Sequence, residues 1–225
     1  LNTSTWYHVV ATYDGSNMKL YINTQLHGTV AETGTLLHDT KPLYIGKYAT
    51  NYADGIMDDI RIYNRALNAT EIMQNYNGNI TTNGLVSWWN FNEGNGNIAY
   101  DSISNNDGTI HGAKWINYGE YALQFNGTGN YATVSHNSDY KPTNAITMEA
   151  WIYIDNFNNH FEILNTKWNH LRFFVNKNTH KLKWVQEFSD GIKSIESDIT
   201  LNTSTWYHVV ATYDGSNMKL YINTQ

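Results

Sequence analysis

The sequence contains no cysteine among its 225 residues, so neither a disulfide framework nor a thiolate metal site can form. No apolar run approaches the length of a membrane-spanning helix. No signal peptide is visible, although an internal fragment would carry none. Charged residues make up only 15%, and 14 Lys and Arg against 20 Asp and Glu give a net charge of −6. This balance argues against nucleic-acid binding, because no basic patch is present to neutralise phosphates.

What the chain does contain is a high share of aromatic residues, 14%, within a hydrophobic content of 41%. A chain of this length and composition can bury a substantial core as one β-sandwich domain. Residues 146–154 alternate apolar and other side chains, which is the pattern of a half-buried strand. Many short strands at regular spacing predict an all-β fold, a two-sheet antiparallel sandwich. The other expected strands are residues 6–13, 18–23, 41–46, 56–63, 85–91, 121–125, 131–134, 161–164, 171–175 and 182–187.

One stretch occurs twice, because residues 1–25 return without a single change as residues 201–225. Within each copy, two β-runs flank a segment that opens with Asp-Gly, which is a strong hairpin signal. The same hairpin is therefore expected at both ends of the chain. The simplest cause is that the chain is a window from a longer array of tandem repeats.

A short helix is expected after the strand at residues 56–63. Leu67, Asn68, Glu71 and Ile72 have the spacing of a capping box with a hydrophobic staple. Ile72 would then dock the helix on the sandwich, together with Met73 and Tyr76. The segment that follows is rich in turn residues and has no apolar period, so it is expected to be a linker.

Several motifs together resemble a known family, the laminin-G-like (LamG-like), concanavalin A-like lectin/glucanase jelly roll. Gly-Leu-Val-Ser-Trp-Trp-Asn-Phe at residues 84–91 is similar to its opening strand. Gly-Ile-Met-Asp-Asp-Ile-Arg-Ile-Tyr-Asn-Arg-Ala-Leu at residues 55–67 is similar to its closing strand and the turn after it. Further matching motifs lie at residues 6–15, 20–23, 92–96, 101–109, 122–127 and 146–152.

The order of these motifs is rotated relative to the family. Residues 1–77 are thus expected to be the C-terminal part of one bead, residues 78–84 a linker, and residues 85–225 the N-terminal part of the next bead. The resemblance implies a jelly roll, and the capping-box spacing adds one short helix after the closing strand. The family includes lectins, adhesins, enzyme appendages and structural repeats, so the fold alone does not decide the function.

Catalysis is not expected. The glucanases that the chain resembles need two carboxylates across a cleft, from a Glu-x-Asp-x-x-Glu strand. Glu196-Ser197-Asp198 is the nearest match, but Leu201 stands where the second Glu is required. No other catalytic motif is present.

A structural calcium ion is the expected cofactor, since the resemblance implies one between the loop of the first strand and the last strand. Ca²⁺ takes six to eight oxygen ligands. Asp58 alternates with Ile60 and Ile62, so it is expected to point inward, where a buried carboxylate needs a partner. The alternative is that Asp58 accepts from backbone amides and that the loop acids are solvated. The further candidate ligands are Asn92, Glu93, Asp101 and Asp107.

Two kinds of carbohydrate site are also expected. Trp115, Tyr118, Trp168 and Trp184 could form a platform on which sugars stack, with Asn169, His170 and Asp190 as polar contacts; the alternative is that these rings belong to the core. The N-glycosylation sequons begin at Asn2, Asn68, Asn79, Asn126 and Asn202, and their modification would indicate an extracellular setting.

The sequence therefore predicts a non-enzymatic, extracellular or cell-surface repeat, whose beads assemble into a fibre or adhesive stalk. Its expected partners are copies of itself, through tandem repetition or strand exchange. The alternative is a carbohydrate-binding lectin module that recognises surface glycans, with or without calcium. Each copy of the hairpin is expected to pack in its own sandwich, because an uncovered hairpin would expose apolar surface and a free strand edge.

Overall fold

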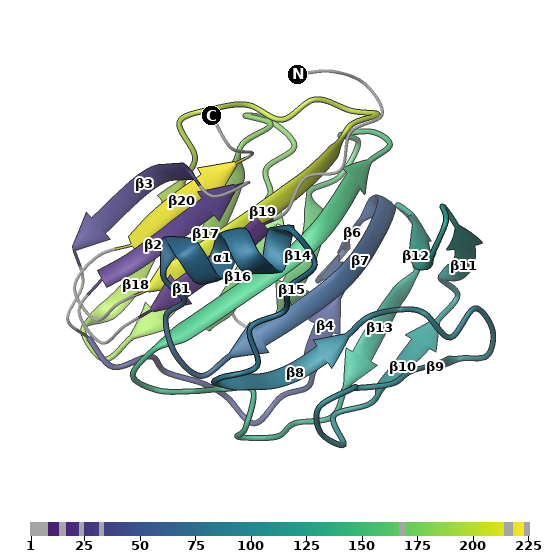
Figure 1. Ribbon diagram of the computed structural model, residues 1–225. Coiled ribbons are helices and arrows are strands. Elements are labelled where there is room, and N and C mark those ends of the chain that lie inside the picture. Colours follow the sequence, from purple (N-terminus) through teal and green to yellow (C-terminus); the bar gives the residue numbers. More distant parts are fainter. Residues whose placement is uncertain are drawn as a thin grey trace.

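The computed structural model describes residues 9–13, 17–22, 25–31, 34–166, 170–213 and 218–222. Two largely antiparallel sheets lie face to face and enclose one hydrophobic core, so the expected all-β sandwich is confirmed (Figure 1). Two short strands, β5 (Lys47–Tyr48) and β6 (Asn51–Tyr52), pair beside it.

The first sheet carries the site described below. Its strands follow the order β1 (Val9–Tyr13), β2 (Asn17–Ile22), β3 (Gln25–Ala31), β20 (Met218–Ile222), β19 (Trp206–Tyr213), β14 (Ile146–Ile154), β7 (Asp54–Tyr63), β12 (Tyr121–Asn126) and β11 (Lys114–Asn117), and β8 (Leu85–Trp89) pairs with β7. Strand β1 also pairs with β14 and, in parallel, with β19. The second sheet follows the order β18 (Gly191–Glu196), β17 (Leu182–Phe188), β16 (Leu171–Val175), β15 (Phe161–Asn165), β4 (Leu43–Ile45), β13 (Tyr131–Val134), β10 (Gly108–His111) and β9 (Ile98–Ala99).

The central strand β14 is buried along almost its whole length, although its sequence alternates like a half-buried strand. The apolar set that includes Met148 and Ile152 faces the core. The other face is covered because the chain after β7 crosses it. There Thr147 accepts a hydrogen bond from the Leu67 N–H and donates one to the Arg65 carbonyl. The chain after β7 therefore covers the outer face of β14, which the alternation of its sequence predicted to be exposed.

The covering layer is helix α1 (Ala69–Tyr76), which begins at the expected capping box. The Asn68 side chain accepts from the Glu71 N–H at 3.0 Å, and the Glu71 carboxylate accepts from the Asn68 N–H at 2.9 Å. Ile72 is buried against the sheet as expected, but Met73 is 43% exposed, so its predicted docking is wrong. Residues three and four apart share a helix face, so the position beside Ile72 on the buried side belongs to Asn75.

Beneath α1 lies a buried ion pair between Arg61 of β7 and Glu149 of β14. The second oxygen of Glu149 accepts from Asn75 Nδ2 at 3.0 Å, and the same nitrogen donates to the Tyr63 hydroxyl at 2.8 Å. Burial raises the pKa of Glu149 to about 7, and the Arg61 guanidinium opposes this rise. The helix is therefore fixed to the sheet by buried polar contacts.

The two segments that the sequence assigned to successive beads complete one sandwich in this chain. Strand β7 pairs with β12, β14 and β8, all of which follow it beyond residue 84. Residues 78–84 therefore connect α1 to β8 inside one sandwich, where the sequence predicted a linker between beads. That the two segments come from successive units of a longer array stays a prediction.

Both copies of the hairpin contact the same two strands. Val210 of β19 is paired with Glu149 of β14, and Val10 of β1 is paired with the same Glu149. The second strand of each copy pairs with β3, where Val30 is paired with both Met18 of β2 and Met218 of β20. We call the space between β14 and β3 the hairpin slot.

The expectation that each copy lies in its own sandwich is therefore wrong for the described strands, because identical sequences find their register on the same partners. The comparison of Trp6 with Trp206 lies outside the described residues, since only Trp206 is described, as buried.

The buried pair leads to a test by a double-mutant cycle. Arg61→Met leaves the buried Glu149 carboxylate without its ion-pair partner and is expected to lower the free energy of unfolding by about 3–5 kcal/mol. Glu149→Leu leaves Arg61 paired with Asp59 and is expected to cost less. The double variant is expected to lose clearly less than the sum. Urea unfolding followed by circular dichroism measures all three. Glu71→Gln, which weakens a more exposed pair with Arg65, serves as control and should cost about 1 kcal/mol or less. Additive losses would contradict the coupling.

Candidate functional site

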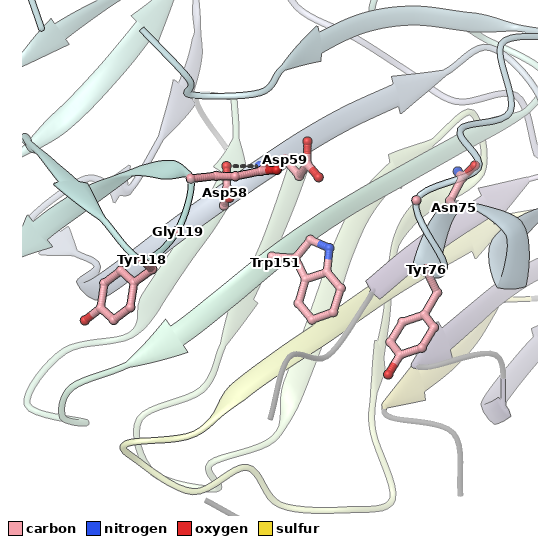
Figure 2. Close-up of a pocket in the computed structure, with 9 residues that line it drawn as sticks. Asp58, Asp59, Asn75, Tyr76, Tyr118, Gly119 and Trp151 are labelled. Atoms are coloured by element: carbon pink, nitrogen blue, oxygen red, sulfur yellow. Dashed lines mark hydrogen bonds between the residues drawn. The ribbon is translucent and has the colours of Figure 1, made fainter. Parts of the chain in front are cut away.

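A cavity of about 460 Å³ opens on the outer face of the first sheet, beside the end of α1. Figure 2 shows the side chains around it, which come from three parts of the fold. The floor is formed by β7 and β14, one wall by the end of α1, and the other wall by the turn between β11 and β12. Its lining residues are Asp58, Asp59, Asn75, Tyr76, Gly78, Tyr118, Gly119, Glu120 and Trp151.

Two neighbouring carboxylates, Asp58 and Asp59, line this cavity together. In a regular strand they would lie on opposite faces. Asp59 adopts a left-handed backbone conformation with φ of 53°, which interrupts the alternation. Asp58 was expected to point inward because it alternates with Ile60 and Ile62. That expectation is corrected here, since the irregularity at Asp59 brings Asp58 to the cavity on the outer face.

The two carboxylates differ in how their charge is balanced. Asp59 accepts from the Trp88 indole Nε1 at 2.7 Å and forms an ion pair with Arg61 at 2.8 Å. Asp58 is only 7% exposed and accepts from the Asp59 N–H at 2.8 Å, and the described residues form no ion pair with it. Burial raises the pKa of Asp58 well above its usual value, and the charges of Asp59 and Glu120 raise it further.

Aromatic rings form the rest of the lining. Tyr76 of α1 stacks on Trp151 of β14, with ring centroids 5.7 Å apart and an interplanar angle of 24°. Trp151 in turn contacts the His208 ring at 5.2 Å. Tyr118 is 52% exposed at the mouth and meets Trp206 edge to face at 5.9 Å. The cavity therefore combines ring surfaces with carboxylates.

Of the four residues predicted to form a sugar platform, the cavity contains Tyr118. Trp115 is half-buried and donates its indole N–H to the Gly96 carbonyl at 2.9 Å. Trp184 is 0% exposed, so its predicted role in a surface platform is wrong; it packs in the core because its position on β17 faces the other sheet. Trp168 and Asn169 lie outside the described residues. Of the other polar candidates, Asp190 pairs with Lys193, and His170 lies beside Glu187.

Sequence reasoning missed Asp59, Tyr76, Glu120 and Trp151 as members of this site. Trp151 carried a signal, because it occupies the outer face of the alternating strand at residues 146–154. No sequence signal pointed to Glu120, because its position depends on where the turn between β11 and β12 lies in the folded chain.

Of the predicted calcium ligands, Asp58 lines the cavity, and Asn92, Glu93, Asp101 and Asp107 do not. Asp101 accepts from the N–H groups of Trp88 and Ile103, and Asp107 accepts from the Asp101 N–H. Glu93 accepts from Tyr100 N–H, and Asn92 from Tyr121 N–H. Within the described part of the chain, no group of three or more His, Asp or Glu side chains is placed to hold a metal ion. Calcium binding therefore stays a prediction.

The described sequon asparagines are Asn68, Asn79, Asn126 and Asn202, and all four are exposed. The Asn68 side chain also caps α1. Asn2 lies outside the described residues. Glycosylation at any of them stays a prediction.

The fold is that of a jelly-roll module of the lectin-like or adhesive kind. The chain belongs to the concanavalin A-like lectin/glucanases superfamily, whose family model matches residues 1–73 and 126–225. The expected resemblance is thus confirmed. No curated protein and no solved structure matches the chain. Among the described residues, no helix has both the length and the apolar character needed to cross a membrane.

The contrast between Asp58 and Asp59 predicts opposite effects of the same substitution. Asp58→Asn removes a buried charge that lacks an ion-pair partner and keeps a side-chain oxygen for the Asp59 N–H. It is expected to raise the free energy of unfolding by about 0.5–2 kcal/mol at neutral pH. Asp59→Asn is expected to lower it by about 1–3 kcal/mol, because it weakens the bonds from Arg61 and Trp88. Urea unfolding of both variants measures this, and a loss of stability in both would contradict the assignment.

Proposed function

We propose that the chain is a non-enzymatic, extracellular adhesive or structural module that associates with copies of itself by exchanging the duplicated hairpin. The observation that carries this proposal is the shared register. Val10 and Val210 are both paired with Glu149, and Met18 and Met218 are both paired with Val30. One slot therefore accepts two identical segments.

Exchange of identical segments costs little free energy, because the contacts made between chains are those of the closed sandwich. A hairpin outside the slot would leave an open strand edge, which favours pairing with another chain. An isolated two-stranded hairpin is at best marginally stable. A chain with two copies and one slot is thus able to offer one copy to the slot of a neighbour, and repetition of this step gives a polymer.

The polar contacts around Glu196 support a role without catalysis. In the nearest match to the glucanase motif, the Glu196 carboxylate accepts from Thr179 at 2.9 Å and from Asn176 at 3.3 Å. These hydrogen bonds hold the loop between β16 and β17 against the edge strand β18, which is a structural role.

Hairpin exchange is testable with cysteine pairs, because the chain contains no cysteine of its own. Ala150 of β14 is paired with Val209, and the residue that corresponds to Val209 in the first copy is Val9. Paired residues of antiparallel strands lie close enough for a disulfide. Ala150→Cys with Val9→Cys is expected to give a ladder of disulfide-linked multimers on a non-reducing gel, increasing with protein concentration.

The matched control is Ala150→Cys with Val209→Cys, which is expected to give mainly a disulfide within one chain. If the Val9 variant instead formed only an internal disulfide, the first copy would use the slot of its own chain. If it formed no disulfide, the first copy would not enter the slot. Either result would overturn the exchange.

The cavity favours a second function, that of a carbohydrate-binding module. Sugar sites in proteins combine ring surfaces with a few convergent polar groups, and Tyr118, Trp151 and the carboxylates provide this combination. Retention of the chain on a glycan column that is lost in Tyr118→Ala would support this candidate. Retention that is unchanged in Tyr118→Ala would count against it.

A further inference from the structure

We propose that the cavity binds a small organic cation, a primary ammonium group carried on a compact ring, as in an amino sugar. This narrows the ligand class of the second candidate function, on which it rests. It is independent of hairpin exchange.

The first argument is the balance of charge. Three carboxylates line the cavity, those of Asp58, Asp59 and Glu120, and none of its described lining residues is Lys, Arg or His. The nearby guanidinium of Arg61 is already shared between Asp59 and Glu149. Asp58 is only 7% exposed, and the N–H of Asp59 is the one hydrogen-bond donor that the described residues give its carboxylate. An uncompensated buried carboxylate is costly unless a cation reaches it.

The second argument is the supply of hydrogen-bond donors. The Asn75 amide is fully used inside the protein, because its nitrogen donates to Tyr63 and Glu149 and its oxygen accepts from the Thr81 N–H. The lining carboxylates that face a ligand as acceptors are then those of Asp58 and Glu120, beside the hydroxyl group of the exposed Tyr118. A neutral sugar is usually met by both donors and acceptors, whereas an ammonium group brings three donors and needs acceptors alone.

The third argument is the ring surface and the size of the cavity. An ammonium group is attracted to the faces of Trp and Tyr, and more strongly where water is excluded. Trp151 and Tyr76 provide such faces beside the carboxylates (Figure 2). A volume of about 460 Å³ lies in the range of sites for small molecules and exceeds what one alkylammonium chain needs. The ring-bearing cation is therefore the better fit.

The test uses isothermal titration of the full chain at about pH 6, where a sugar amine is protonated. The probes are D-glucosamine, N-acetyl-D-glucosamine, Nα-acetyl-L-lysine amide and calcium chloride. Glucosamine is expected to bind about 10-fold or more tightly than its neutral N-acetyl form, since a charged hydrogen bond is lost with the amine. Asp58→Asn and Glu120→Gln are each expected to weaken glucosamine binding about 10-fold. Asp139→Asn, at an exposed acid that does not line the cavity, should leave it unchanged.

Each other result would overturn the proposal in a recognisable way. Equal binding of both sugars would identify a site for neutral sugars and leave the carbohydrate-binding candidate standing. Tighter binding of the lysine amide would identify a protein side chain as the ligand. Calcium binding that is abolished by Asp58→Asn would identify the cavity as a metal site. If none of the probes bound, the proposal that the cavity binds an ammonium group, on an amino sugar or otherwise, would be wrong. Glu120 is exposed, so its variant keeps the test informative if the Asp58 variant has altered folding.

Discussion

One guanidinium group organises the outer face of the first sheet. Arg61 lies between Asp59 and Glu149, and its plane stacks over the Trp88 ring at 4.7 Å. Its charge favours the ionised form of Glu149, whose second oxygen accepts from Asn75, and Asn75 fixes the end of α1. Because the Arg61 guanidinium already forms ion pairs with Asp59 and Glu149, it forms none with Asp58. The same interaction thus fixes the helix and defines the electrostatics of the cavity beside it.

A second constraint is geometric, and it concerns β14. One edge of this strand pairs with β19 over eight consecutive residue pairs, from Ile146 with Tyr213 to Tyr153 with Trp206. Register in such a strand is strongly specified where its apolar face is buried, because a slip by one residue would turn that face outward. Two segments of identical sequence therefore find the same register, and sequence alone cannot direct them to different places.

The sequence predicted the layout of the fold because its signals are local. Alternation located β14, and the spacing from Leu67 to Ile72 located the start of α1. The capping box was correct because its hydrogen bonds join residues three apart. Met73 was assigned to the wrong face of α1. Which side chains of a short helix face solvent depends on how the helix is rotated on the sheet, and no local sequence pattern encodes this rotation.

The candidate site was harder to predict, because its members meet only after the chain has folded. The left-handed residue at Asp59 has no signature in a run that otherwise reads as a regular strand. Trp184 could not be assigned from sequence either, since aromatic residues on an alternating strand are equally suited to the core and to a surface platform. Glu120 and Asp58 are 62 positions apart and come together through the pairing of β7 with β12.

The cavity and the hairpin slot share a boundary, and this has a consequence for both functions. Trp151 contacts His208, and Tyr118 contacts Trp206, so two cavity side chains rest on residues of the second hairpin copy. The first copy has His8 and Trp6 at the corresponding positions. A hairpin supplied by a neighbouring chain in the same register would present the same rings to Trp151 and Tyr118. Because the duplication is exact in sequence, hairpin exchange would leave the chemistry of the cavity unchanged, so the two proposed functions are compatible in one module.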